Sequence, residues 1–253
     1  MPLFHPSTRR AARLGVAFVV ASVSAGAEPI AHTSFETEVA VPGAYTDTGD
    51  AAADHDLTNH PGEPLVDATP ASAVGGELAF DARYVNSRGS VGQSDGDEMG
   101  VSADASAVGA YSDGTHGYHL SDADGTAVLA FAPVDLSLPG VVIQVDLFVR
   151  EADWEPDDRV RVVADLDGAP DVVLLDTSGS DIDDLGIEGR WRRLGAAIPD
   201  ASTSARIRVE LESDQAAEAV FVDRVNVLPE PGGVASLAVG TLFVAALAQR
   251  PRG

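Results

Sequence analysis

Residues 141–150, VVIQVDLFVR, have the pattern that decides the fold. The odd positions from Ile143 to Val149 are all apolar, while Gln144 and Asp146 occupy even positions between them. Successive side chains of a strand point to opposite faces, so this alternation predicts a strand with one face in an apolar core. The segment therefore indicates a β-protein.

The same alternation recurs along the chain. It is clear in residues 159–165, 205–211 and 219–227, where valine, isoleucine and leucine alternate with polar residues. Shorter predicted strands, separated by Asp-Gly pairs typical of turns, cover residues 78–82, 117–120, 127–131, 172–175 and 191–194. Residues 39–74 have weak periodicity, which predicts a long, ordered or partly ordered loop after the first strand. These features predict an all-β fold, an antiparallel β-sandwich of jelly-roll-like topology.

The composition limits the possible functions. The 253 residues carry a formal net charge of −24, and every one of the 16 basic residues is arginine. This charge repels nucleic acids and anionic lipid surfaces and attracts divalent cations, although acidic residues are also common in solvated loops without a dedicated function. The chain has no cysteine, which excludes thiol catalysis, thiolate metal sites and disulfides. Calcium would be a natural substitute for the missing cross-links.

The first 27 residues have the pattern of a secretory signal. A basic segment with three arginines precedes an apolar run, residues 14–24, and the small residues Ala25 and Ala27 then form a cleavage pattern before Glu28. We therefore expect export, an N-terminal signal helix over residues 1–27, and a single sandwich domain over residues 28–228.

The last 25 residues, PEPGGVASLAVGTLFVAALAQRPRG (residues 229–253), form a second targeting segment. Residues 234–248 carry no charge, and the arginines that follow favour the cytoplasmic side of a membrane. We expect a hydrophobic transmembrane helix with the N-terminus outside. Because the run is shorter than the ~20 residues that span a bilayer comfortably, it is typical of a short, temporary anchor.

This tail resembles a known sorting signal. Pro229, Glu230 and Pro231, then a glycine- and alanine-rich apolar run, then Arg250 and Arg252 are similar to the PEP-CTERM signal. The resemblance covers only the tail, and here a proline separates the two arginines. It implies recognition and cleavage near the Pro-Glu-Pro by an exosortase, a membrane protease. An ordinary stop-transfer helix is the alternative.

Asp223 is the residue of the body that most needs an explanation. It shares the parity of the apolar residues in the predicted strand 219–227, and a carboxylate in an apolar layer is costly unless it is paired or bound to a metal. Glu36, after Phe35, belongs to the first predicted strand, and the terminal strands of a jelly roll commonly lie side by side.

The two acids carry a second, diffuse resemblance, over residues 30–227. Phe35-Glu36 and the segment around Asp223 are similar to the first and last strands of carbohydrate-binding modules and galactose-binding-like sandwiches. In those folds two such acids often hold a structural calcium, so the resemblance implies Glu36 and Asp223 as calcium ligands. Arg224 departs from the usual pattern, and a salt bridge between Asp223 and an arginine is the alternative.

Aromatic side chains bear on sugar binding, because flat rings stack on pyranose faces. Trp154, in the polar loop 151–158, and Tyr111 are the candidate exposed platforms. The alternative for Trp154 is a plug packed on the edge of the sandwich, and Trp191 is expected in the core.

The remaining acidic and histidine clusters suggest no site. Acidic runs such as Glu155-Pro-Asp157-Asp158 are expected to be solvated turns, and the Asp-Gly pairs at 124–125 and 167–168 to be hairpin turns. His116 and His119 would lie on opposite faces of a strand, which does not favour a zinc site. The sequence has no Gly-x-Ser-x-Gly, His-Glu-x-x-His or phosphate-binding glycine motif.

Three functions are compatible with these features. The first is a noncatalytic cell-surface or extracellular-matrix protein, sorted by an exosortase and associated with exopolysaccharide. The second is a calcium-dependent carbohydrate-binding module with a defined ligand site. The third is a secreted polysaccharide hydrolase, which no residue constellation supports. We expect the first, and no enzymatic activity.

Overall fold

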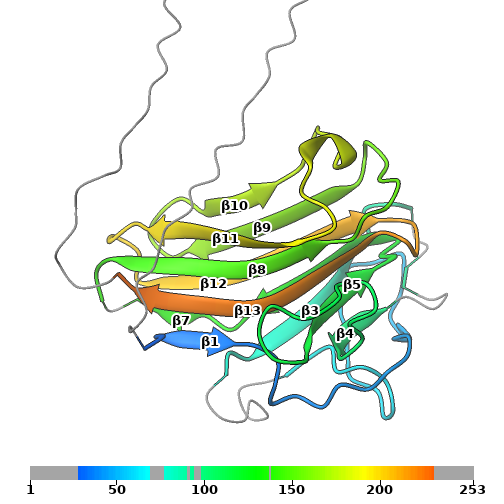
Figure 1. Ribbon diagram of the computed structural model, residues 1–253, viewed down its shortest axis with the longest axis horizontal. Coiled ribbons are helices and arrows are strands. Elements are labelled where there is room, and N and C mark those ends of the chain that lie inside the picture. The colour runs from blue at the N-terminus through cyan, green and yellow to red at the C-terminus, as the bar shows by residue number, and fades with distance from the viewer. Residues whose placement is uncertain (1–27, 69–76, 90–91, 94–97, 137, 231–253) are drawn as a thin grey trace, which may run out of the picture.

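The computed structural model of the chain describes residues 28–68, 77–89, 92–93, 98–136 and 138–230 (Figure 1). The predicted signal helix, the apolar run of the tail, and Pro231, Arg250 and Arg252 lie outside the described residues. Within the described part, no helix has the length and apolar character needed to cross a membrane. The described helical element is a 3-10 helix, η1 (Asp183–Leu185).

Two sheets form a β-sandwich, which confirms the predicted all-β fold (Figure 1). All pairings between the named strands are antiparallel. Sheet A has the order β11 (Trp191–Ile198), β8 (Val141–Val149), β13 (Ala219–Pro229), β5 (Gly117–Ser121) and β4 (Met99–Ser102), with β1 (Ala31–Thr33) also on β13. Sheet B has the order β10 (Val172–Asp176), β9 (Arg159–Leu166), β12 (Ser204–Ser213), β6 (Gly125–Phe131), β3 (Phe80–Val85) and β2 (His55–Asp56), with β7 (Val134–Asp135) on β12.

The chain crosses between the sheets several times. β8 lies in sheet A and β9 in sheet B, and β12 in sheet B is followed by β13 in sheet A. Asp124-Gly125 likewise joins β5 in sheet A to β6 in sheet B, so the predicted hairpin at this point is wrong. Asp167-Gly168 does join paired neighbours, β9 and β10, as predicted.

The core fills the space between the sheets with alternate residues of each strand. Ile143, Val145, Leu147 and Val149 of β8 all belong to it, as the alternation in this segment predicts. Part of the predicted long loop also contributes, because Tyr45, Leu57 and Val66 are buried in the same core. The described part of that loop is therefore packed.

A bulge in the last strand changes which way Asp223 points. The register of β13 against β8 shifts between Asp223 and Val225, and Arg224 has a φ of 38°. Val220, Val222, Val225 and Val227 consequently face the main core together, on both sides of the bulge. The expectation that Asp223 shares a face with Val225 and Val227 is wrong, because the extra residue reverses the parity.

Candidate functional site

A groove runs along the outer face of sheet B. The outward side chains of β6 that line the groove, Val128 and Ala130, are short, and the residues that alternate with them, Ala127, Leu129 and Phe131, face the core. On β12, Arg208 lies beside Ala130, and on the other side β3 places Asp81 beside Ala130 and Arg83 beside Val128. Residues in register share a face of a sheet, so β6, with its short outward side chains, lies between two strands with long side chains. We call β6 the low strand of the groove.

The groove has a volume of about 680 Å³. Its floor continues past β6 into Ala132 and Pro133. One ion pair joins the two walls across β6, because Arg206 Nη2 of β12 lies 2.6 Å from Asp81 Oδ2 of β3. On the β12 side, Arg208 Nη2 donates to Asp165 Oδ1 of β9 at 2.8 Å. An apolar floor between walls of paired donors and acceptors is the chemistry that accommodates a polyhydroxylated ring.

Asp67 adds an acceptor to the groove. The pKa of Asp67 is raised by burial and by the nearby carboxylates of Asp81 and Asp56. Its Oδ1 is buried and lacks a hydrogen-bond partner within the described chain, and Asp67 is among the residues that line the groove.

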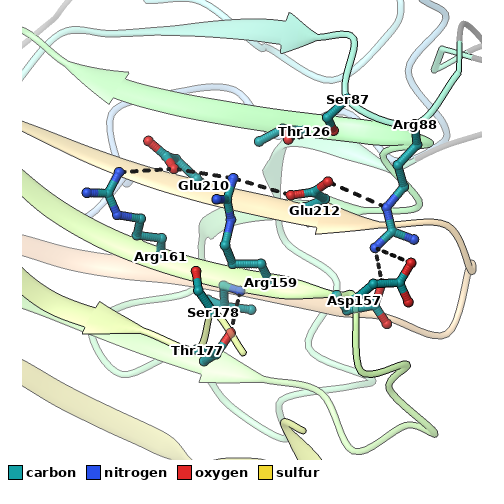
Figure 2. Close-up of polar contacts among 12 residues, drawn as sticks. Ser87, Arg88, Thr126, Asp157, Arg159, Arg161, Thr177, Ser178, Glu210 and Glu212 are labelled. Carbon is teal, nitrogen blue, oxygen red and sulfur yellow. Dashed lines mark hydrogen bonds and ion pairs between the residues drawn. The ribbon is translucent and has the colours of Figure 1, made fainter. Parts of the chain in front are cut away.

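A ladder of ion pairs extends from the groove along β12 and β9 (Figure 2). Arg161 Nη1 is 3.6 Å from Glu210 Oε2, and Arg159 Nη2 is 3.3 Å from Glu212 Oε2. Glu212 Oε1 in turn lies 3.8 Å from Nε of Arg88, which follows β3. The ladder therefore leads from the groove toward one end of the sandwich.

At that end four carboxylates come together. Glu155, Asp158, Asp214 and Glu218 each place a carboxylate oxygen within 4.8 Å of the others, and we call these residues the acidic cluster. Glu155 and Asp158 belong to the crossover between β8 and β9, and Asp214 and Glu218 to the crossover between β12 and β13. The prediction of a solvated turn is wrong for Asp158, which is 2% exposed.

The electrostatics of the acidic cluster are unusual. Burial and the neighbouring Glu155 raise the pKa of Glu218 to about 9. Burial also raises the pKa of Asp158 to about 6, although Arg88 opposes this. A hydrogen bond with Glu218 lowers the pKa of Glu155. The cluster is thus a place where negative charge is costly without a compensating cation.

Glu36 and Asp223, the predicted calcium ligands, are found near each other in the fold. β1 and β13 are paired, as predicted. The prediction that Glu36 belongs to the first strand is wrong, because β1 ends at Thr33 and Glu36 lies in the turn that follows. The carboxylate of Asp223 accepts hydrogen bonds from the Ser112 hydroxyl (2.9 Å) and the Asp113 amide (2.7 Å), and Glu36 accepts from the His116 amide (2.6 Å). Donors of one loop thus satisfy both acids. Within the described residues, the acidic group close enough together to hold a metal is the acidic cluster instead, so calcium at Glu36 and Asp223 stays a prediction.

Neither carboxyl group has the pKa of a fully solvated acid. Burial raises the pKa of Asp223 to about 7. For Glu36, burial alone would raise the pKa, but the amides of Thr115 and His116 hold it below the usual value. The guanidinium of Arg224 binds Asp146 (Nε to Oδ2, 2.9 Å), so the alternative of an Arg224 salt bridge to Asp223 is wrong.

The two aromatic residues predicted as sugar platforms are buried. Trp154 is 3% exposed, and its indole N–H donates to the carbonyl of Arg150 at 3.1 Å. The alternative prediction, a ring packed against the sandwich, therefore describes Trp154. Tyr111 is 8% exposed and packs against Trp191, with ring centroids 6.2 Å apart. Stacking on a sugar needs an open ring face, so both predictions are wrong for this conformation. Trp191 is half-buried outside the main core, against Phe148 on the outer face of sheet A.

The similarities of this chain to known proteins are structural and distant. No family model and no curated protein matches the chain. Among solved structures it is similar to a family 16 carbohydrate-binding module (18% identity, 51% of this chain and 86% of that one, TM-score 0.35). It is also similar to the xylan-binding domain of carbohydrate-binding module family 22 (15%, 70% and 100%, 0.35) and to the K2 adhesin domain of Lys-gingipain (11%, 69% and 99%, 0.39).

Proposed function

We propose that this protein is an exported, noncatalytic β-sandwich of jelly-roll-like topology that binds polysaccharide in the groove on sheet B. The observation that carries the proposal is the low strand β6, whose Val128 and Ala130 lie between the charged side chains of β3 and β12. A sugar ring has apolar C–H faces and a rim of hydroxyls, which match such a floor and such walls.

The walls also suit hydroxyl groups better than a free charge. Three arginines and three aspartates line the groove, so its formal charges cancel, and each donor has an acceptor close by. Guanidinium and carboxylate groups both bind vicinal hydroxyls through pairs of hydrogen bonds. A neutral glycan can therefore gain several hydrogen bonds without bringing an unpaired charge into the groove.

Delivery to the cell surface completes the proposal. The signal pattern over residues 1–27 supports export, and the tail from Pro229 supports sorting by an exosortase after transient anchoring in the membrane. The protein would then reside on the cell surface or in the extracellular matrix, where exopolysaccharide is its ligand.

Affinity electrophoresis of the full chain through gels that contain the producing cell's exopolysaccharide tests this function. We expect the polysaccharide to retard the chain relative to a gel without it. Ala130→Arg should abolish the retardation, because the long side chain fills the floor of the groove.

The matched control is Ala197→Arg, which adds the same charge and volume to an exposed position on β11 of sheet A. This variant should be retarded like the native chain. No retardation of the native chain, or equal retardation of the two variants, would contradict binding in the groove.

A further inference from the structure

We propose that the acidic cluster is a calcium site that joins the two crossover loops at one end of the sandwich. The site is separate from the groove and does not depend on the proposed function. It also differs from the pair Glu36 and Asp223, which binds another loop.

Two members of the acidic cluster, Asp158 and Glu218, are buried, so the cluster is more than a group of surface acids. Glu218 is 0% exposed, and its Oε1 is buried without a hydrogen-bond partner among the described residues. Oε2 of Glu155 is also buried and lacks a partner. Apart from the contact between the Glu155 and Glu218 carboxyl groups themselves, no group of the described residues hydrogen-bonds to these two oxygens. Carboxylate oxygens in a group only 4.8 Å across are unfavourable unless a proton or a cation lies among them.

Arg88 supplies only part of the required positive charge. Its guanidinium lies 2.7 Å from Asp158 Oδ1 and 3.0 Å from Asp214 Oδ2, so one cation serves these two carboxylates. The ion pairs of Arg88 do not include Glu155 or Glu218. Glu155 and Glu218 are the two carboxyl groups left for a second cation.

The ligands suit calcium. Calcium takes 6–8 oxygen ligands in flexible geometry and accepts bidentate carboxylates, whereas magnesium retains its own waters. Four carboxylates, two of them from the half-buried Glu155 and the exposed Asp214, provide such ligands and leave an opening toward solvent. Water can reach the ion through that opening and complete its coordination.

The position of the site indicates a structural role for the ion. One crossover carries the chain from β8 in sheet A to β9 in sheet B, and the other from β12 in sheet B to β13 in sheet A. An ion held by both loops would tie the two sheets together at this end. In a chain without cysteine, calcium would do the work of a disulfide.

Calorimetric titration of CaCl₂ into the full, chelator-treated chain tests the site. We expect one calcium per chain and a higher unfolding temperature in calcium. Glu218→Gln keeps the shape of the buried side chain but cannot form the carboxylate that binds calcium. Asp214→Asn removes a carboxylate at an exposed position where folding is not at risk. Each should weaken calcium binding by about tenfold or more, since affinity follows the charge of the ligands.

Glu212→Gln is the matched control, because Glu212 contacts Arg88 and Arg159 but lies outside the acidic cluster. This variant should bind calcium like the native chain. If the native chain binds no calcium, the two glutamates share a proton instead and the proposal fails. It fails equally if neither Glu218→Gln nor Asp214→Asn changes the affinity.

Terbium luminescence locates the ion. Trp154 directly precedes Glu155 and is buried in the same loop, so it should sensitise Tb³⁺ bound in the acidic cluster. Calcium should compete for the signal, and Trp154→Phe should remove most of it. Emission that persists in this variant would place the ion elsewhere and overturn the proposal.

Discussion

Glu36 and Asp223 accept hydrogen bonds from opposite ends of one loop, residues 112–116. Asp223 Oδ2 holds the amide of Asp113 at 2.7 Å, and Glu36 Oε1 holds the amides of Thr115 (2.7 Å) and His116 (2.6 Å). Between these anchors the chain turns at Gly114, with a φ of 73°. The two acids therefore fix the loop on sheet A from positions that are far apart in sequence.

The turn at Gly114 should not tolerate a side chain. A Cβ there would lie 2.3 Å from Cδ of Glu36, in a backbone conformation that L-residues rarely adopt. We expect Gly114→Ala to lower the free energy of unfolding by about 2 kcal/mol or more, measured by denaturant titration.

Gly109 provides the control for this substitution. It has the same φ of 73°, but a Cβ there would meet nothing within 4 Å. Gly109→Ala should therefore show the backbone cost alone, about 1 kcal/mol. Equal losses in the two variants would mean that the contact with Glu36 does not hold the loop.

Asp223 should make the stability of the fold depend on pH. Its pKa is raised to about 7 in the folded chain, from 3.8 in the unfolded chain. The folded chain keeps this proton more firmly, so the stabilisation is full below pH 3.8 and is lost as the pH rises through 7.

The effect can be isolated by comparing the native chain with Asp223→Asn in the presence of chelator. Between pH 5 and pH 8 the native chain should lose about 2 kcal/mol of unfolding free energy relative to the variant. The acids of the acidic cluster are present in both proteins and cancel in the difference. Parallel curves for the two proteins would show that Asp223 does not titrate in this range.

The two tryptophans should differ in their access to solvent. In Trp191→Phe only Trp154 remains, and its buried ring should emit at short wavelength and resist quenching by acrylamide. In Trp154→Phe the half-buried Trp191 should be quenched more strongly. If Trp154 were quenched as readily as Trp191, the ring would be open and the prediction of a sugar platform would return.

The alternation of apolar residues was sufficient to predict most of the strands, because period 2 requires no knowledge of their partners. Residues 141–149, 159–166 and 204–213 form strands close to the predicted bounds. The short strands β2, β4 and β7 were missed, since two to four residues are too few to show a period. The bulge at Arg224 was missed because one extra residue leaves the composition of a strand unchanged.

The acidic cluster and the groove depend on contacts that sequence patterns do not contain. Glu155 and Glu218 meet only because two crossovers end at the same place, and the sequence shows each merely as an acid in a polar segment. The low strand of the groove is visible as Val128 and Ala130. That these two residues form the floor of a groove follows only from the register, which places Arg208 and Asp81 on either side of Ala130.

The position of β13 also determines when the protein can fold. This strand pairs with β8, β5 and β1 in the interior of sheet A, yet in chain order it comes last among the strands of the described residues. Until residues 219–229 arrive, sheet A is divided, and the edges of β8 and β5 are free to pair with other chains. The sandwich therefore assembles only after the chain has been synthesised through Pro229, and a chain truncated before Ala219 would be prone to aggregate.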